Sequence, residues 1–197
     1  SRGLGDVYKR QDYKDAHLSV TASLRNLSGK DFKNLTLDYT LYEAPLYGDP
    51  DASTKPFISK TTAPVTVKKG LEDNVALTFD VPGAKLWNME KPYRYVLVAQ
   101  LKDNKGKVLE TVSTNVGFRQ VEIRDTPASE DEFGKAGRYY YINGKTVKLR
   151  GVNRHETSPL YGHTVPREQM EEEIMLMKRA NINHIRNSHY PEPTRPY

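Results

Sequence analysis

The first half of the chain is a series of short segments in which apolar and polar residues alternate. Such alternation puts the apolar side chains on one face of a β-strand. The alternating apolar positions are Leu18, Val20, Ala22 and Leu24, then Leu35, Leu37, Tyr39 and Leu41, then Val65 and Val67, then Val75, Leu77, Phe79 and Val81. Residues 95–101 add a mostly apolar strand, and 108–123 continue in extended form. Six or seven strands without a helical pattern between them predict an antiparallel β-sandwich of immunoglobulin-like type over residues 12–124.

The pattern changes after residue 124. The polar, acidic stretch DTPASEDEFGKAG, residues 125–137, predicts a linker. The segment YYYINGKTVKLRGVN then predicts a hairpin, because Asn143-Gly144 is a strong signal for a tight turn. PREQMEEEIMLMKRAN predicts an amphipathic helix that carries Met170, Ile174 and Met177 on one side. A short strand, INHIR, follows the helix.

A strand, a helix and a second strand within about 40 residues are typical of a parallel α/β unit. One such unit cannot close a barrel or bury both faces of a sheet. We therefore predict that residues 138–197 are the N-terminal part of a larger domain. Its apolar side chains, such as those of Val147, Leu149, Ile182 and Ile185, should then lack neighbours, and this part should be less ordered than the sandwich.

The first eleven residues, SRGLGDVYKRQ, show neither periodicity nor the apolar region of a signal peptide. Since DVYKRQ resembles the translation of a sequencing adapter, we predict that 1–11 is a non-native leader and leave it out of the fold prediction. The targeting signal, and with it the choice between bacterial cytoplasm and periplasm, stays open.

Composition excludes several classes of function. The net charge is +5 and is scattered along the chain, so no basic stripe favours nucleic-acid binding. No segment approaches the roughly 18 apolar residues that a membrane span requires. The chain has no cysteine, which excludes disulfides and thiolate metal sites.

Two polar clusters stand at the ends of the two strands that flank the helix. The first contains Asn153, Arg154, His155 and Glu156, and the second runs from Arg186 through Tyr190. The carboxyl ends of parallel strands meet at one edge of a sheet, and neighbouring strands are about 4.8 Å apart. The sequence therefore predicts one mouth that carries two imidazoles, a guanidinium and an amide, a set suited to binding a polyhydroxylated ligand.

Each of these residues also has a simpler interpretation. A histidine at a strand end is often only packed or solvated, and Arg186 could form a structural salt bridge. Glu156 could act as a general acid, although a supporting role beside a histidine or arginine is favoured. A zinc site needs three suitable ligands, and the segments NRHE and SHYP lack the required spacing, so no metal site is predicted in this chain.

The residues after 142 also carry a family resemblance. NGKTVKLRGVNRHETSPLYGHTV and MEEEIMLMKRANINHIRNSHYP closely resemble the glycoside hydrolase family 2 β-galactosidases, and VGFRQVEI and WNMEKPYRYVLVAQL resemble the preceding immunoglobulin-like domain of that family. The resemblance implies a sandwich followed by the first βαβ unit of a (β/α)8 catalytic barrel. It also implies a retaining glycosidase, with two glutamates as nucleophile and acid/base.

The resemblance assigns roles to few residues here. His155 and His189 match histidines that bind galactose hydroxyls and support the transition state, and Arg186 matches an arginine that orients the sugar-binding shell. Asn153 and Glu156 match supporting positions. Both catalytic glutamates, and the ligands of a magnesium ion near the acid/base, belong to later segments of the family barrel. This chain alone is thus expected to be inactive, while the parent enzyme is expected to bind β-galactosides and to form a homo-oligomer.

Three alternatives remain. A β-glucuronidase of the same family is possible, although the segment 153–162 looks more like that of a galactosidase. A carbohydrate-binding module would use exposed aromatic residues such as Tyr42, Tyr47 and Trp87, whereas the simpler role for Trp87 is a packing anchor at the end of the sandwich. The sandwich could also be a spacer between domains, since an immunoglobulin-like fold implies no activity of its own.

Overall fold

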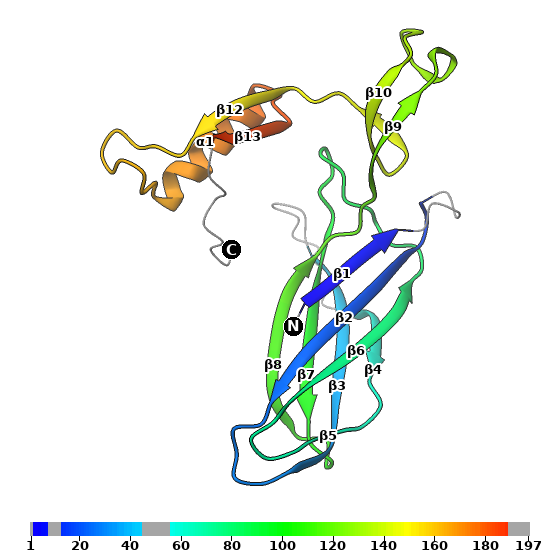
Figure 1. The fold of residues 1–197 in the computed structure, drawn as a ribbon, viewed down its shortest axis with the longest axis vertical. Helices are drawn as coiled ribbons and strands as arrows, with labels where there is room; N and C mark the ends of the chain where they lie inside the picture. The colour runs from blue at the N-terminus through cyan, green and yellow to red at the C-terminus, as the bar shows by residue number, and fades with distance from the viewer. Residues whose placement is uncertain (1, 8–12, 45–55, 189–197) are drawn as a thin grey trace. The chain divides into compact units, whose positions relative to one another are not determined.

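The structure is a computed structural model that describes residues 2–7, 13–44 and 56–188. The chain divides into two compact units, Ser1–Thr146 and Val147–Tyr197. The first unit is built of β-strands, and the second contains the helix (Figure 1). The fold is mainly β, as predicted from the alternating pattern.

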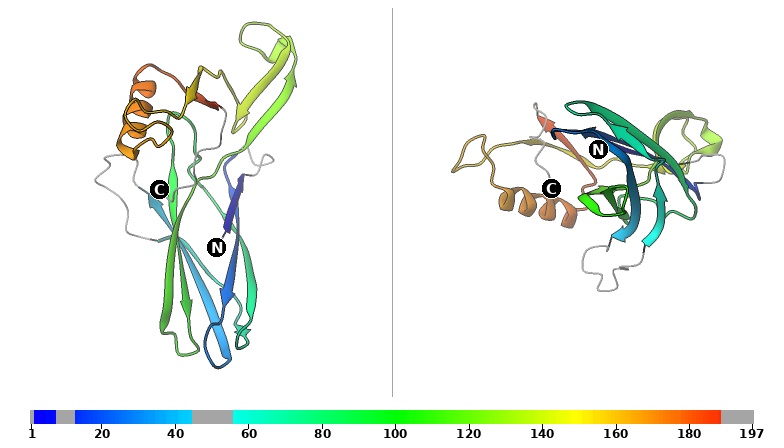
Figure 2. Two further views of the ribbon diagram at one scale, coloured as in Figure 1. Left: turned by 60° about the vertical axis from the view of Figure 1, so that its left-hand side comes forward. Right: turned by 90° about the horizontal axis from the view of Figure 1, so that it is seen from below.

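Two antiparallel sheets form the body of the first unit. One sheet has the order β1-β2-β6, and the other has the order β4-β3-β7-β8, with β5 also paired to β3. Figures 1 and 2 show the two sheets as separate layers. The strands of the first sheet are β1 (Arg2–Val7), β2 (Ala16–Arg25) and β6 (Glu72–Val81), and those of the second are β3 (Phe32–Ala44), β4 (Pro56–Thr61), β5 (Val65–Val67), β7 (Arg94–Lys102) and β8 (Val108–Val116). The predicted sandwich is confirmed.

The core lies between these sheets and uses the predicted alternation. On β2, the side chains of Ala16, Leu18, Val20 and Ala22 are buried, while the residues between them are more exposed. They meet buried residues of β3, β6 and β7, which include Leu37, Tyr39, Leu41, Val75, Phe79, Val81, Tyr95 and Leu97. The core is therefore complete on the inner faces of β2, β3, β6 and β7.

The segment predicted to be a leader takes part in the first sheet. β1 (Arg2–Val7) pairs with β2 in antiparallel register, from Arg2 opposite Thr21 to Val7 opposite Ala16. Residues 2–7 thus belong to the described fold, and excluding 1–11 left one strand out of the predicted sandwich. A non-native origin for this segment stays a prediction.

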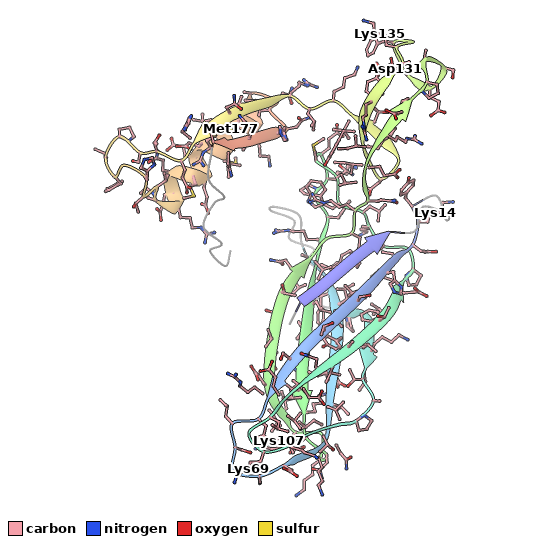
Figure 3. The ribbon with its side chains drawn as sticks, viewed as in Figure 1. Lys14, Lys69, Lys107, Asp131, Lys135 and Met177 are labelled. Atoms are coloured by element: carbon pink, nitrogen blue, oxygen red, sulfur yellow. The ribbon has the colours of Figure 1, made fainter. Side chains whose placement is uncertain are left out.

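A small sheet follows the sandwich, in the order β11-β10-β9. Its strands are β9 (Val121–Thr126), β10 (Gly137–Ile142) and β11 (Lys145–Val147). Most of the predicted linker 125–137 is the loop between β9 and β10, where the 3-10 helix Ala128–Glu130 lies. Asp131 accepts hydrogen bonds from the backbone N–H groups of Phe133 and Lys135 in this loop, and Figure 3 labels Asp131 and Lys135 there.

The turn between β10 and β11 is the one predicted from Asn143-Gly144. Both residues have positive φ, 50° and 75°, as a type I′ turn requires. Asn143 also fastens this turn to the sandwich, because its Nδ2 donates to the carbonyl oxygen of Trp87 at 3.0 Å and its Oδ1 accepts from the backbone of Gln120 at 2.9 Å. The turn is therefore both locally encoded and anchored.

The second unit contains one parallel βαβ arrangement. β12 (Gly151–His155) pairs in parallel with β13 (His184–Ser188), and α1 (Arg167–Arg179) connects them. Pro166 stands at the N-cap, and Lys178 and Arg179 lie in the last turn of the helix, where the helix dipole favours cations. Asn181, at a φ of 60°, follows the end of the helix. The predicted strand–helix–strand order is confirmed.

Candidate functional site

The register of β12 and β13 decides which polar side chains share a face of this sheet. Asn153 lies opposite Arg186, and His155 lies opposite Ser188. Paired residues on neighbouring strands point to the same side, and side chains two apart on one strand do so as well. Asn153, His155 and Arg186 are therefore on one face, and the structure leaves all three exposed. We call these three side chains the polar face.

The other face of the two strands is turned toward α1. Arg154 lies on that face, and its Nε donates to Oε2 of Glu173 on the helix at 2.7 Å. The Arg154 side chain is only 8% exposed. The helix thus covers one side of β12, while the polar face is on the opposite side.

The predicted site residues are brought together in part. Asn153 and Arg186 are paired in the middle of β12 and β13, and His155, on the same face, is the last residue of β12. Glu156 follows β12 and is half-buried, and its carbonyl oxygen lies 3.3 Å from Nδ1 of His163. His189 lies outside the described residues, so the predicted meeting of the imidazoles of His155 and His189 stays a prediction.

The loop after β12 is held by backbone hydrogen bonds close to His155. Thr157 donates its N–H to the carbonyl oxygen of His155 at 3.0 Å. Ser158 and Gly162 exchange two backbone hydrogen bonds of 2.7 and 3.0 Å, and Ser158 is buried. The strand end that carries His155 is therefore continued by a tight turn.

Sequence reasoning did not find the polar contacts that hold the unit together. Glu173 accepts from Arg154 through one oxygen and from Nε2 of Gln169 through the other, at 2.8 Å. Partial burial raises the pKa of Glu173, but the hydrogen bonds from Gln169 and Arg154 and the charge of Arg154 outweigh it, so the pKa lies below its ordinary value. Glu173 is ionised at neutral pH and pairs with the guanidinium.

The side of α1 that is partly buried agrees with the prediction for Met170 and Met177 but not for Ile174. Gln169, Met170, Glu173 and Met177 are the partly buried residues, whereas Ile174 is 46% exposed. Figure 3 labels Met177 on this helix. The apolar spacing alone put Ile174 on the contact face, whereas Glu173, which pairs with Arg154, is partly buried there. The i, i+4 spacing of Gln169 and Glu173 was the available signal.

Asn183 is a second missed contact, at the opposite end of the strand pair. Its Oδ1 accepts from the backbone N–H of Arg150 at 2.7 Å, and its Nδ2 donates to the carbonyl oxygen of Lys148 at 2.9 Å. Asn183 therefore ties the residue before β13 to the residues before β12. Together with the Arg154–Glu173 pair, it holds both ends of the parallel strands.

Trp87, one of the aromatic residues considered for a carbohydrate-binding module, is arranged for packing. The Arg119 guanidinium carbon lies 4.5 Å from the centre of the Trp87 ring, and a Cβ added at Gly117 would touch that ring at 3.7 Å. The backbone N–H of Trp87 donates to the carbonyl oxygen of Phe118 at 2.8 Å. Trp87 is thus a packing anchor, and Tyr47 lies outside the described residues.

In the ranges 2–7, 13–44 and 56–188, no group of three or more His, Asp or Glu side chains is placed to hold a metal ion. In the same ranges, no helix has the length and apolar character needed to cross a membrane.

Comparison with protein families gives two matches. Residues 5–119 match the model described as glycosyl hydrolases family 2, and residues 136–197 match the model described as the TIM barrel domain of glycosyl hydrolases family 2. The first match covers most of the sandwich and the second covers β12, α1 and β13. Residues 120–135, which include β9, separate the two matches, and β10 and β11 lie within the second.

Several β-galactosidases are similar in sequence. The chain is 36% identical to a β-galactosidase of Priestia megaterium over 91% of its own length, and 34% identical to a β-galactosidase of Kluyveromyces lactis over 94%. It spans 16% and 17% of those two relatives, respectively.

Solved structures show the same fold. A β-glucuronidase of Bacteroides uniformis is similar with a TM-score of 0.73 and 25% identity, covering 92% of this chain and 19% of that one. A β-glucuronidase of Parabacteroides merdae is similar with a TM-score of 0.72 and 23% identity, covering 98% of this chain and 21% of that one.

Proposed function

The chain belongs to glycosyl hydrolase family 2, and from this we propose that it is part of a retaining β-galactosidase acting on terminal β-D-galactosides. The similar β-galactosidases support this choice of sugar, because they match both the sandwich and the βαβ unit. In this proposal the sandwich is a spacer, and the βαβ unit contributes one wall of the sugar pocket.

The register of β12 and β13 is the observation that carries the proposal. It puts Asn153, His155 and Arg186 on one exposed face of parallel strands, with His155 at the carboxyl end of β12, which is the end where barrel enzymes bind their ligands. An amide, an imidazole and a guanidinium together donate and accept hydrogen bonds, as sugar hydroxyls require. On the opposite face, Arg154 is engaged with Glu173 of α1.

We assign each residue a role in that wall. His155, together with His189, binds galactose hydroxyls and stabilises the transition state, and Arg186 orients the sugar-binding shell. Asn153 and Glu156 support these side chains. Retention needs two carboxyl groups about 5–5.5 Å apart, a nucleophile and an acid/base. In the proposal, both groups and the ligands of a magnesium ion lie outside this chain.

The proposal is tested with two preparations of the protein. The complete protein that contains this chain should hydrolyse nitrophenyl β-galactoside with retention at the anomeric carbon. The 197-residue chain alone should show no turnover, because the paired carboxyl groups are supplied elsewhere. Turnover by the 197-residue chain that disappears in His155→Ala would contradict the assigned division of roles.

A β-glucuronidase is the second candidate, and the Bacteroides uniformis structure favours it. The two functions differ in chemistry, since a glucuronide presents a carboxylate that the enzyme must neutralise. The ratio of kcat/KM for nitrophenyl β-galactoside to that for nitrophenyl β-glucuronide, measured on the complete protein, separates them. A ratio above one supports the galactosidase, and a ratio below one supports the glucuronidase.

A further inference from the structure

Arg154 is the one residue of β12 that is buried, and it is a cation. Its neighbours on either side, Asn153 and His155, are exposed on the polar face. Burying a guanidinium costs free energy unless hydrogen bonds and an opposite charge compensate for it. Arg154 lies between Asn153 and His155, two residues that are candidates for binding the sugar. Filling space alone therefore does not explain a buried charge at this position.

The contacts of Arg154 form a chain from the strand into the helix. Its Nε donates to Oε2 of Glu173 at 2.7 Å, and Oε1 of Glu173 accepts from Gln169 at 2.8 Å. Both carboxylate oxygens are thus engaged, and Gln169 lies one turn before Glu173 on α1. The hydrogen bond from Gln169 restrains the carboxylate of Glu173, and the carboxylate in turn restrains the guanidinium of Arg154.

The contacts of Arg154 with Glu173 and Gln169 affect the polar face through the backbone of β12. Side chains of successive strand residues point to opposite faces, so fixing Arg154 on the helix side fixes the direction of Asn153 and His155 on the other side. The next backbone contact, from Thr157 to the carbonyl oxygen of His155, continues the restraint into the loop. β12 and the start of its loop are held where a ligand would meet them.

We propose that Arg154 is a positioning residue, which with Glu173 and Gln169 sets the direction of the Asn153 and His155 side chains toward the sugar. This inference rests on the proposed function. Lysine is a poor substitute, because its ammonium is a point charge that lacks the planar arrangement of donors of a guanidinium. The assignment differs from a general structural role, because it expects changes confined to the end of β12.

The first test measures amide hydrogen exchange in the 197-residue chain. In Arg154→Lys, the amides from Asn153 to Glu156 should exchange about tenfold faster, as expected for a weakened local restraint. Those of α1 and of the sandwich should keep their rates. Unchanged rates at 153–156, or an equal increase throughout β12, α1 and β13, would contradict the proposal.

A matched control is present on the same helix. Arg167 donates through Nε to Oε1 of Glu171 at 2.7 Å, but both side chains are 59% exposed. Arg167→Lys makes the same chemical change in an exposed pair whose two members both lie on α1, and it should leave the exchange at 153–156 unaltered. Glu173→Gln, which keeps the size of the side chain, should reproduce the effect of Arg154→Lys and serves if the latter fails to fold.

The second test uses the complete protein. Arg154→Lys and Glu173→Gln should each lower kcat for nitrophenyl β-galactoside by about tenfold or more, since a small misplacement of a positioning strand is costly. KM should change less, and the double variant should resemble either single variant. If the complete protein is active and kcat is unchanged in both variants, the positioning role is contradicted while the proposed function stands. If the wild-type complete protein is inactive, the proposed function itself is contradicted.

Discussion

The internal contacts that stabilise each of the two units of this chain are of different kinds. The sandwich buries a continuous cluster of apolar side chains between two sheets, and Leu18, Leu41 and Val81 in it are fully buried. In the described part of the second unit, Val165 is the one buried apolar residue, and α1 buries none of its residues completely. Polar contacts through Arg154 and Asn183, together with the pairing of β12 and β13, link the elements of that unit.

This difference shows what each unit requires from its surroundings. The sandwich has its own core, so its stability is expected to be independent of further segments. The βαβ unit exposes apolar side chains, among which are Leu149, Ile174 and Leu176 at 45%, 46% and 55% exposure. It also leaves a polar face open, which suits a part whose neighbours complete both a barrel and a binding site.

The same substitution in the two units should give the largest contrast. Leu41→Ala removes a fully buried side chain and should lower the free energy of unfolding of the sandwich by about 2–5 kcal/mol. Leu176→Ala removes a side chain that is 55% exposed on α1, and it should change the free energy of unfolding of the βαβ unit by about 0.5 kcal/mol or less. Urea unfolding of the 197-residue chain measures both, and equal losses would contradict the comparison.

Amide hydrogen exchange should rank the two units directly. The amides of β12 and β13 should exchange about a hundredfold faster than those of β2 and β3, because local opening of a unit without an apolar core costs less free energy. The measurement is made on the 197-residue chain at one pH. Uniform protection across both units would show that the βαβ unit is as stable as the sandwich.

The anchored turn between β10 and β11 is expected to be sensitive to one methyl group. Gly144 has a φ of 75°, and a Cβ there would lie 2.5 Å from the ring of Tyr13, whose hydroxyl donates to Glu122. Gly144→Ala should therefore destabilise the chain by about 2–3 kcal/mol, from backbone strain and crowding together.

Gly106 provides the control for that prediction. It has a φ of 79° but nothing within 4 Å of an added Cβ. Gly106→Ala should cost only the backbone term, about 1 kcal/mol. Similar losses of unfolding free energy for the two variants would mean that the contact with Tyr13 does not restrain the turn.

The smallest expected effect depends on pH and lies on the sandwich. The hydrogen bond from Lys102 is the main cause that holds the pKa of Asp38 below its ordinary value of 3.8. Since the folded pKa is the lower one, the pair stabilises the fold above the ordinary value, and this contribution is lost as the pH falls through the folded pKa. Asp38→Asn should thus lower stability by about 0.5–1 kcal/mol at pH 7 and by less near pH 2.

The exposed Asp73 on β6 is a suitable control for the charge change. Asp73→Asn should alter the unfolding free energy by less than about 0.5 kcal/mol at pH 7. A loss for Asp38→Asn that stays the same from pH 7 to pH 2 would show that the carboxylate charge is not the stabilising group.

The sequence allowed most of the fold to be predicted, because burial of alternating residues and the Asn143-Gly144 turn are local signals. The parallel pairing of β12 and β13 followed from strand–helix–strand order, and this put Asn153, His155 and Arg186 at one edge. The contact between Arg154 and Glu173 could not be predicted, since 19 positions separate the two residues and the apolar spacing of the helix favoured Ile174. The strand β1 was missed because its segment does not alternate.

The polar face as a sugar-binding wall is most directly tested by kcat/KM for nitrophenyl β-galactoside, measured on the complete protein and its His155→Ala variant. Loss of a hydrogen bond to the transition state predicts a decrease of about 10- to 100-fold for the variant. A kcat/KM within twofold of the wild-type value would show that His155, and with it the exposed face of β12 and β13, does not contact the sugar.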